Sequence, residues 1–203
     1  WWRDRRCFWS FDHDESCWWS LNVSGVVVMS ATHSFLILGG ARSGKTRHAL
    51  EIAQRQPKRV YIATAEAWDD EMRERIMRHK EERDETWVTV EEPLYLPAAI
   101  ERVDAPNQAI VVDCLTLWLS NLMGAERDLE QETAQLVSAL TGRQSTIVLV
   151  SNEVGLGIVP ENALARAFRD AQGRLNQQIA AVVDNVDFVA VGLALNLKPG
   201  HSS

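Results

Sequence analysis

The sequence predicts an α/β fold in which a mostly parallel sheet carries helices on both faces. Three observations support this prediction. From residue 34 onward, strand-like and helix-like segments alternate, which is typical of parallel strands joined by helices. Several strand candidates are continuous apolar runs, as expected of strands buried on both faces. A glycine-rich loop follows the first strand candidate, at the position where such sheets bind phosphate.

The first expected strand, 34–38, leads into a phosphate-binding loop. The loop reads Gly39-Gly40-Ala41-Arg42-Ser43-Gly44-Lys45-Thr46 and fits the pattern G-x-x-x-x-G-K-[ST]. In this pattern backbone N–H groups point at phosphate oxygens, Lys45 reaches the β- and γ-phosphates, and the Thr46 hydroxyl ligates Mg²⁺. The helix expected over 45–56 adds the positive end of its dipole. Together these features predict a P-loop NTPase of the RecA-like, three-layer type.

The remaining elements follow in alternation, with prolines near their edges, where proline is tolerated. Further strands are expected over 59–63, 86–90, 109–113, 145–150 and 187–192. Further helices are expected over 67–83, 94–103, 115–123, 128–141 and 160–183. No internal repeat and no linker composition interrupts this series, so residues 29–203 are expected to form a single nucleotide-binding domain.

Ligands of such sheets bind beyond the carboxyl ends of the strands. This rule gathers the phosphate loop, Ala63-Thr64-Ala65, Asp113 and Ser151-Asn152-Glu153 at one edge. Asp113 ends an apolar run, as a metal-binding carboxylate of the Walker B kind does, and would hold Mg²⁺ opposite Thr46. An aspartate after a strand is also a common helix cap, and the upstream phosphate loop favours the metal role.

His79 lies on the same helical face as Trp68, Met72 and Ile76, so it is expected to point toward the protein. An imidazole in that position is either a packed histidine or a nucleophile that attacks phosphorus. The cations around it either form a solvated helix face or bind a triphosphate. The spacing does not decide between these alternatives.

The segment from Ser151 to Pro160 has two glycines and a closing proline, which predict an irregular loop with exposed backbone. Glu153 in this loop is a candidate base or metal contact, and equally a candidate cap of the helix that begins near Pro160. That helix carries polar side chains, which are expected to form a solvated face. They are Arg166, Arg169, Arg174, Asn176 and Gln177.

Composition narrows the classes of partner. The chain has 203 residues, 46% of them hydrophobic, and a formal net charge of −7, which argues against a nucleic-acid groove or an anionic membrane as main partner. No apolar stretch is long enough to span a membrane. The three cysteines lack metal-ligand or disulfide spacing, which indicates a reducing cytoplasm.

Residues 1–28 differ from the rest of the chain. They hold five of the eight tryptophans in no regular period, and they lack the arrangement of a signal peptide. Met29 then begins an ordinary lead into the first strand. We expect residues 1–28 to be a disordered or artefactual extension, and the alternative is a Trp-rich interaction tail.

Taken together, the motifs resemble those of the bifunctional adenosylcobinamide kinase / adenosylcobinamide-phosphate guanylyltransferase family, over about residues 34 to 195. The phosphate loop is generic, whereas the segments around His79 and Asn152 are specific to the family. The matching stretches are Gly39–Thr46, Tyr61–Ala65, Asp69–Met72, Arg75–Lys80, Val112–Leu119, Ser151–Pro160 and Phe168–Asp170.

The resemblance implies two reactions in cobalamin biosynthesis. ATP or GTP first phosphorylates the hydroxyl of adenosylcobinamide. The family's histidine, matched by His79, then attacks the α-phosphate of GTP, and the GMP passes to adenosylcobinamide phosphate to give adenosylcobinamide-GDP. The resemblance also implies homotrimers, with Lys45 as a second catalytic residue and Mg²⁺ as cofactor. It places nucleotide contacts on Gly39–Thr46 and on Ala63, Thr64, Ala65, Lys80, Glu81, Glu82, Arg83, Glu91 and Asp113.

Two other interpretations remain at this point. The first is a P-loop small-molecule kinase in which His79 is structural. The second is a nucleotide-dependent switch with negligible turnover.

Overall fold

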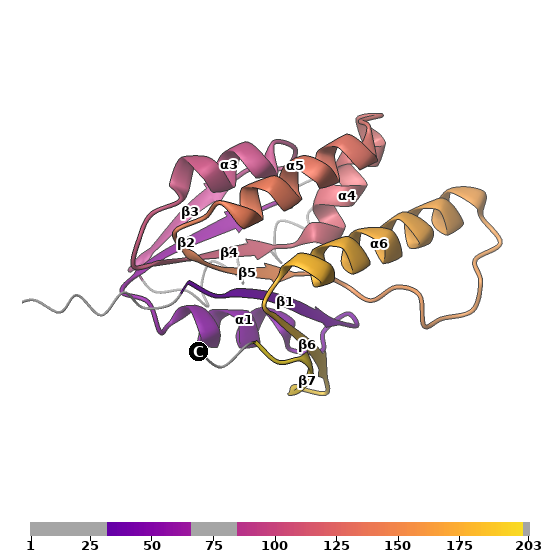
Figure 1. Ribbon diagram of the computed structural model, residues 1–203. Helices are drawn as coiled ribbons and strands as arrows, with labels where there is room; N and C mark the ends of the chain where they lie inside the picture. The colour runs from indigo at the N-terminus through magenta and orange to yellow at the C-terminus, as the bar shows by residue number, and fades with distance from the viewer. Residues whose placement is uncertain (1–31, 66–84, 201–203) are drawn as a thin grey trace, which may run out of the picture.

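The computed structural model describes residues 32–65 and 85–200, which build one seven-stranded sheet (Figure 1). The strand order is β3-β2-β4-β5-β1-β6-β7. Six strands run parallel, and the edge strand β7 runs antiparallel to β6. The strands are β1 (Ser34–Gly39), β2 (Lys58–Ala63), β3 (Trp87–Glu91), β4 (Gln108–Asp113), β5 (Thr146–Val150), β6 (Asn185–Ala190) and β7 (Leu193–Lys198). The predicted α/β class and parallel sheet are confirmed.

The helices lie where the apolar periodicity predicts them, with small changes at their ends. They are α1 (Lys45–Ala53), α3 (Leu96–Val103), α4 (Leu115–Gly124), α5 (Leu129–Thr141) and α6 (Ala163–Val182). α6 begins after Pro160 because the Asn162 side chain caps it, accepting hydrogen bonds from the N–H groups of Leu164 and Ala165. The helix expected over 67–83 and the extension 1–28 lie outside the described residues.

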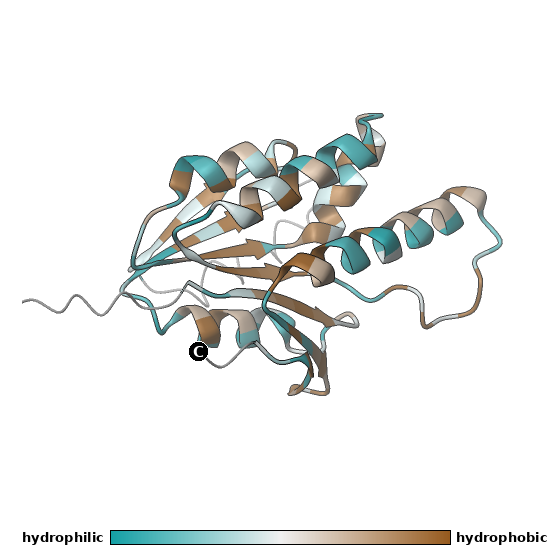
Figure 2. Cartoon of the chain, in the orientation of Figure 1, coloured by the Kyte–Doolittle hydropathy of each residue, from teal (hydrophilic) through white to brown (hydrophobic). Residues whose placement is uncertain are grey.

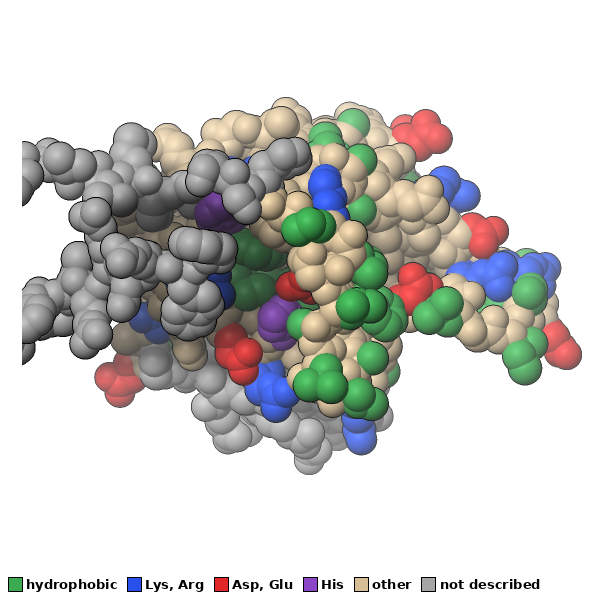
Figure 3. Space-filling view, turned by 60° about the horizontal axis from the view of Figure 1, so that its bottom comes forward, with side chains coloured by type: hydrophobic (Ala, Val, Ile, Leu, Met, Phe, Trp, Pro, Cys, Tyr) green, Lys and Arg blue, Asp and Glu red, His purple; other side chains and the backbone are tan. Residues whose placement is uncertain are grey.

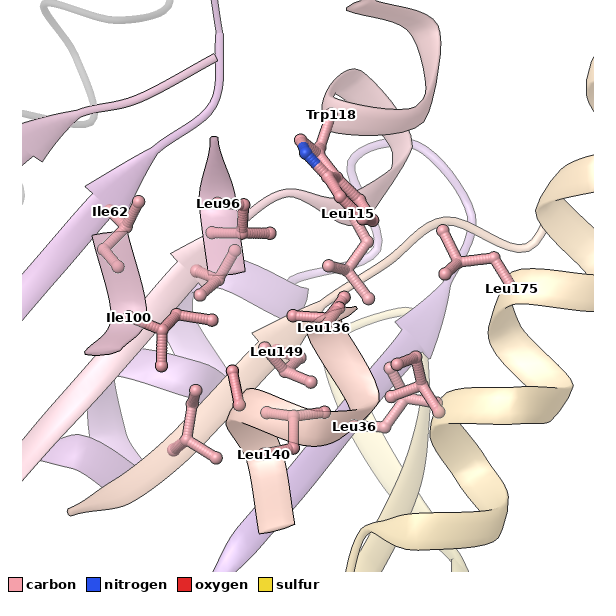
Figure 4. Close-up of a cluster of buried hydrophobic side chains, with 14 of the residues drawn as sticks. Leu36, Ile62, Leu96, Ile100, Leu115, Trp118, Leu136, Leu140, Leu149 and Leu175 are labelled. Atoms are coloured by element: carbon pink, nitrogen blue, oxygen red, sulfur yellow. The ribbon is translucent and has the colours of Figure 1, made fainter. Parts of the chain in front are cut away.

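Two hydrophobic layers hold the helices against the sheet (Figure 1). On one face, Ala49, Ile52 and Ala53 of α1 pack on Ile37 and its neighbours from β4 and β5. On the other face, α3, α4, α5 and α6 together cover the sheet. Figure 4 shows leucines and isoleucines from these helices and the strands gathered in one cluster, with the fully buried Trp118 at its edge beside Leu115. The strands are apolar on both sides because both faces are covered.

Strand β7 is a correction to the expected fold. The strand expected over 187–192 ends at Ala190, and Val191 and Gly192 form the turn of a hairpin with β7. Both turn residues have positive φ angles, 49° and 81°, as a tight two-residue turn requires. Figure 2 colours most of the hairpin as hydrophobic, and Leu193, Leu195 and Leu197 are nevertheless exposed. The residues of this strand are exposed, so they lack the continuous buried apolar run that identifies the central strands in the sequence. Its apolar pattern alone was therefore a weak indication of a strand.

Within the described ranges, no helix is both long enough and apolar enough to cross a membrane.

Candidate functional site

The ends of four parallel strands meet at one edge of the sheet and form the candidate site. These strands are β1, β2, β4 and β5, and β5 lies between β1 and β4. The expected grouping of the phosphate loop, residues 63–65, Asp113 and residues 151–153 therefore agrees with the sheet order.

The phosphate loop leaves β1 at Gly39 and enters α1 at Lys45. Gly39 has a φ of 154°, and a Cβ atom built on it would lie 2.3 Å from the Val189 carbonyl oxygen, so a larger residue does not fit. Gly44, with a φ of 101°, is the N-cap of α1 and provides no side-chain cap. The first N–H groups of α1 are therefore available to an anion. The Ser43 hydroxyl is buried and has no hydrogen-bonding partner in the described part of the chain, which also fits a loop that binds phosphate.

Lys45 is buried at the start of α1, and its Nζ donates a hydrogen bond to the Gly40 carbonyl oxygen at 2.5 Å. Burial lowers the pKa of its ammonium group below the usual value, while the negative charge of Asp113 acts in the opposite direction. A phosphate chain in the loop would replace the carbonyl as the partner of this ammonium group.

Asp113 connects the end of β4 to the phosphate loop. Its Oδ2 accepts hydrogen bonds from the Thr46 hydroxyl at 2.7 Å and the Tyr61 hydroxyl at 2.9 Å. The alternative role of Asp113 as a helix cap is not observed, since Cys114 occupies the N-cap of α4. The Thr46 and Asp113 oxygens fit Mg²⁺, which prefers few protein ligands and keeps water or phosphate for the rest. The described residues contain no cluster of three or more acidic, histidine or cysteine side chains that could hold a metal.

Residues 63–65 extend β2 toward the same edge. The Thr64 side chain is fully buried, and its hydroxyl both donates to the Cys114 carbonyl at 2.7 Å and accepts from the Cys114 N–H at 2.8 Å. The Thr64 N–H donates to the Asp113 carbonyl, and its own carbonyl accepts from the Asn121 side chain. Thr64 therefore fixes the position of Asp113, and Ala63 and Ala65 flank it.

Glu153 also lies at this edge, and its N–H donates to the Gly39 carbonyl at 3.1 Å. Its Oε1 accepts a hydrogen bond from the Gly155 N–H at 2.5 Å. The alternative in which Glu153 caps the following helix is wrong, because Asn162 is the cap of α6.

The remaining residues expected in the site are Glu91 and the segment that begins at His79. Glu91 is exposed at the end of β3, where it pairs in register with Ala63. His79 and the segment Lys80-Glu81-Glu82-Arg83 lie outside the described residues, so their roles stay predictions.

The sequence predicted that the polar residues of α6 form a solvated face. The structure shows that not all of them do. Arg174 and Gln177 are exposed, whereas Asn176 is 6% exposed and hydrogen-bonds to the loop after β5. The prediction is therefore wrong for Asn176.

The β6–β7 hairpin is a part of the site that the sequence did not reveal. Its Gly192 N–H donates to the Ser43 carbonyl at 2.9 Å, and the Arg47 guanidinium donates to the Gly192 carbonyl at 3.2 Å. Below the turn, His48 Nε2 and Asp187 Oδ2 lie 2.9 Å apart. The available signal was Gly192 between two apolar runs, which is typical of a tight hairpin.

Comparison with known proteins shows which family this sequence matches. Residues 35–197 match the sequence model of the family described as cobinamide kinase / cobinamide phosphate guanyltransferase. The chain is 43% identical over 178 residues to the bifunctional adenosylcobalamin biosynthesis protein CobU of Salmonella typhimurium, covering 80% of this chain and 98% of that protein. It is 45% identical over 166 residues to the bifunctional adenosylcobalamin biosynthesis protein CobP of Pseudomonas aeruginosa, covering 80% and 96%.

A solved structure supports the fold. An ATPase from the type III secretion system of pathogenic bacteria superimposes with a TM-score of 0.53 at 10% sequence identity, covering 81% of this chain and 56% of that chain. At this identity the similarity shows a shared fold of the P-loop type and no shared substrate.

Proposed function

The chain belongs to the cobinamide kinase / cobinamide phosphate guanyltransferase family, and we propose that it catalyses both reactions that give this family its description. In the first, ATP or GTP phosphorylates the hydroxyl of adenosylcobinamide. In the second, GMP passes from GTP to adenosylcobinamide phosphate and gives adenosylcobinamide-GDP. The observation that carries the proposal is the 2.7 Å hydrogen bond between Thr46 and Asp113, which joins the phosphate loop to the carboxylate that we propose as a Mg²⁺ ligand.

The phosphoryl transfer requires mainly positioning and neutralisation of charge. The N–H groups of the phosphate loop and the Lys45 ammonium would hold the β- and γ-phosphates. Mg²⁺, held by Thr46 and Asp113 together with the nucleotide, would supply further positive charge. Glu91 and the residues around Thr64 flank this arrangement, which supports their proposed contacts with the nucleotide.

For guanylyl transfer we propose His79 as the nucleophile. Its imidazole would attack the α-phosphorus of GTP, the bond to the bridging oxygen would break, and pyrophosphate would leave. The acceptor phosphate would then displace the imidazole. We propose Lys80, Glu81, Glu82 and Arg83 as guanine-nucleotide contacts on the strength of the family's motif.

Labelled nucleotides test the two steps separately. GTP labelled at the α-phosphate should leave acid-labile label on the wild type and on His33→Ala, a matched histidine variant, and none on His79→Ala. ATP labelled at the γ-phosphate should label cobinamide with the wild type and fail with Lys45→Ala. If His79→Ala keeps the protein-bound label, His79 is not the nucleophile. If the wild type labels cobinamide but never itself, the chain is a kinase alone, and if it does neither, the nucleotide serves as a switch.

We also propose that the enzyme acts as a homotrimer in the cytoplasm, with no nucleic-acid partner. The surface at the free edge of the sheet supports an oligomer. Val191, Leu193, Leu195 and Leu197 are between 56% and 91% exposed on the β6–β7 hairpin. Figure 3 shows hydrophobic side chains at the surface on this side of the molecule, which carries α1 and the hairpin. Exposed apolar edges of this kind are commonly covered by a partner.

A further inference from the structure

The segment after β5 lies at the centre of the site. The last residue of β5, Val150, pairs in register with Ile37 of β1 on one side and with Asp113 of β4 on the other. Residues 151 and 152 therefore leave the sheet between the phosphate loop and the metal-binding carboxylate. A phosphate chain held by that loop and by Asp113 would end beside this segment.

The backbone of this segment is fixed from three sides. The Asn152 N–H donates to the Thr116 hydroxyl of α4 at 2.8 Å, and the Asn152 carbonyl accepts from the Asn176 side chain of α6 at 3.2 Å. On either side, the Ser151 N–H donates to the Ile37 carbonyl at 2.9 Å and the Glu153 N–H to the Gly39 carbonyl. Asn152 is therefore held rigidly relative to the phosphate loop.

A buried polar cluster of Ser151, Gln172 and Asn176 supports this arrangement. The Ser151 hydroxyl donates to Asn176 Oδ1 at 2.7 Å, and Gln172 Nε2 lies 2.9 Å from the Ser151 hydroxyl and 3.0 Å from Asn176 Oδ1. All three residues are buried, and Gln172 is completely inaccessible. Apolar residues of similar shape would pack α6 against the sheet about as well. The distinctive effect of the cluster is thus to position the loop.

The Asn152 side chain differs from its backbone. It is partly exposed, and among the described residues its carboxamide has no hydrogen-bonding partner. An amide carries two N–H donors without a net charge. An unpaired donor on a fixed backbone, beside the end of a phosphate chain, can contact the phosphate oxygens.

We propose that the Asn152 amide donates a hydrogen bond to the terminal phosphate of the bound triphosphate, and that Thr116, Ser151, Gln172 and Asn176 are its positioning residues. The inference rests on the proposed function and extends it to a residue with no assigned role. In the kinase step the acceptor oxygen bonds to the γ-phosphorus, and the bond to the bridging oxygen breaks with its electron pair leaving on the diphosphate. The hydroxyl proton is released to solvent. Asn152 stabilises charge on the transferred group and exchanges no proton.

Asn152→Ala tests the contact. We expect kcat for phosphoryl transfer to fall about a hundredfold, the effect typical of one lost donor to a transition state, with a smaller change in KM for the nucleotide. Binding provides a readout that is independent of the acceptor. In a His79→Ala background, where no covalent transfer interferes, Asn152→Ala should weaken the β,γ-imido analogue of GTP about tenfold and GDP by less than twofold, by calorimetry.

Thr116 and Asn176 test the positioning. Thr116→Val removes the hydroxyl that accepts from Asn152 and should lower kcat about tenfold, whereas Thr116→Ser should restore it, with thermal melting recorded for both. Asn176→Leu should behave like Thr116→Val, and the exposed neighbour Gln177→Leu should not change kcat. If Thr116→Val lowers the melting temperature but has the same kcat as Thr116→Ser, the role of Thr116 is only structural.

The outcomes separate this inference from the proposed function. If the wild type does not phosphorylate cobinamide, the proposed function fails and the binding comparison still decides on Asn152. If Asn152→Ala keeps both its kcat within threefold and its preference for the triphosphate analogue, the proposed contact is refuted. If Asn152→Ala does not fold, the Thr116 pair decides, and equal kcat values for Val and Ser would refute the inference.

Discussion

At the residue scale, the buried ammonium group of Lys45 lowers the stability of the folded protein. Its pKa is lowered mainly by burial, so the charged form is less favourable in the folded protein than in the unfolded chain. The unfolded chain then binds more protons between the folded pKa and the usual value of 10.5. The destabilisation is complete below the folded pKa and disappears as pH rises through that window. Bound phosphate favours the ammonium form and offsets this effect.

Lys45→Met should therefore stabilise the protein and abolish its function. At pH 7 we expect a higher Tm than in the wild type, and triphosphate affinity reduced about a hundredfold because a charge-assisted contact is lost. The stabilisation should shrink as pH rises toward 10.5, measured by thermal melting over a pH series. Exposed Lys58→Met is the matched control and should change neither property. A lower Tm for Lys45→Met at pH 7 would contradict the argument.

Cys114 directly follows Asp113, and its surroundings make its thiol unreactive. Burial, together with the negative charge of Asp113, raises the pKa of the Cys114 thiol to about 12. At pH 8 only about one molecule in ten thousand would carry the reactive thiolate. In a variant with Cys7→Ser and Cys17→Ser, an aromatic disulfide reagent should label the native protein negligibly and the urea-unfolded protein completely. Rapid labelling of the native variant would show that Cys114 is accessible.

At the element scale, α6 is anchored at both ends by residues outside it. Asn162 caps its N-terminus, and the Lys198 ammonium of β7 donates to the carbonyls of Ala180 at 2.9 Å and Val183 at 2.6 Å. The lysine therefore satisfies carbonyls that have no partner within the helix, and its charge complements the helix dipole. Through this contact the edge strand holds the helix that positions Asn176.

Lys198→Met should lower the free energy of unfolding by about 1–2 kcal/mol, since several charge-assisted hydrogen bonds at a helix end are lost. Asn162→Ala should cost about 1 kcal/mol at the opposite end. Urea unfolding measures both, and a parallel shift of midpoints without a change of slope would indicate a pure loss of stability. If Lys198→Met unfolds at the wild-type urea concentration, the cap contributes nothing.

At the scale of the whole molecule, the two edges of the sheet differ. β3 forms one edge and exposes Val88, whereas β7 forms the other edge and exposes a stripe of leucines. The hairpin that carries this stripe also contacts the phosphate loop through Gly192. A partner bound at the β7 edge would therefore touch an element that supports the site.

Leu195→Lys should dissociate the proposed trimer, because it places a charge in the middle of the apolar stripe. Sedimentation velocity should show the wild type as a trimer and Leu195→Lys as a monomer, with the matched edge variant Val88→Lys remaining trimeric. A monomeric wild type would refute the trimer, and dissociation by Val88→Lys alone would move the interface to β3.

The sequence predicted the fold and the phosphate loop because both depend on local patterns. Apolar runs, helical periodicity and proline placement identify each central strand and helix. The spacing of Gly39, Gly44, Lys45 and Thr46 identifies the loop without any knowledge of its neighbours. The position of Asp113 at the end of an apolar run predicted a Mg²⁺ ligand opposite Thr46. The structure brings the two side chains within 2.7 Å of each other, and the metal role stays a prediction.

The features that only the tertiary structure reveals are contacts between segments that are far apart in the sequence. In the sequence, Asn176 cannot be told apart from the exposed polar residues of the same helix. It is buried against Ser151 only because α6 approaches the end of β5. Likewise, the contact of Gly192 with Ser43 joins residues about 150 positions apart. The sequence by itself determined that this chain carries a phosphate-binding loop between a buried strand and a helix. The packing of α4, α6 and the β6–β7 hairpin determined which side chains surround it, because local periodicity carries no information on sheet order or helix contacts.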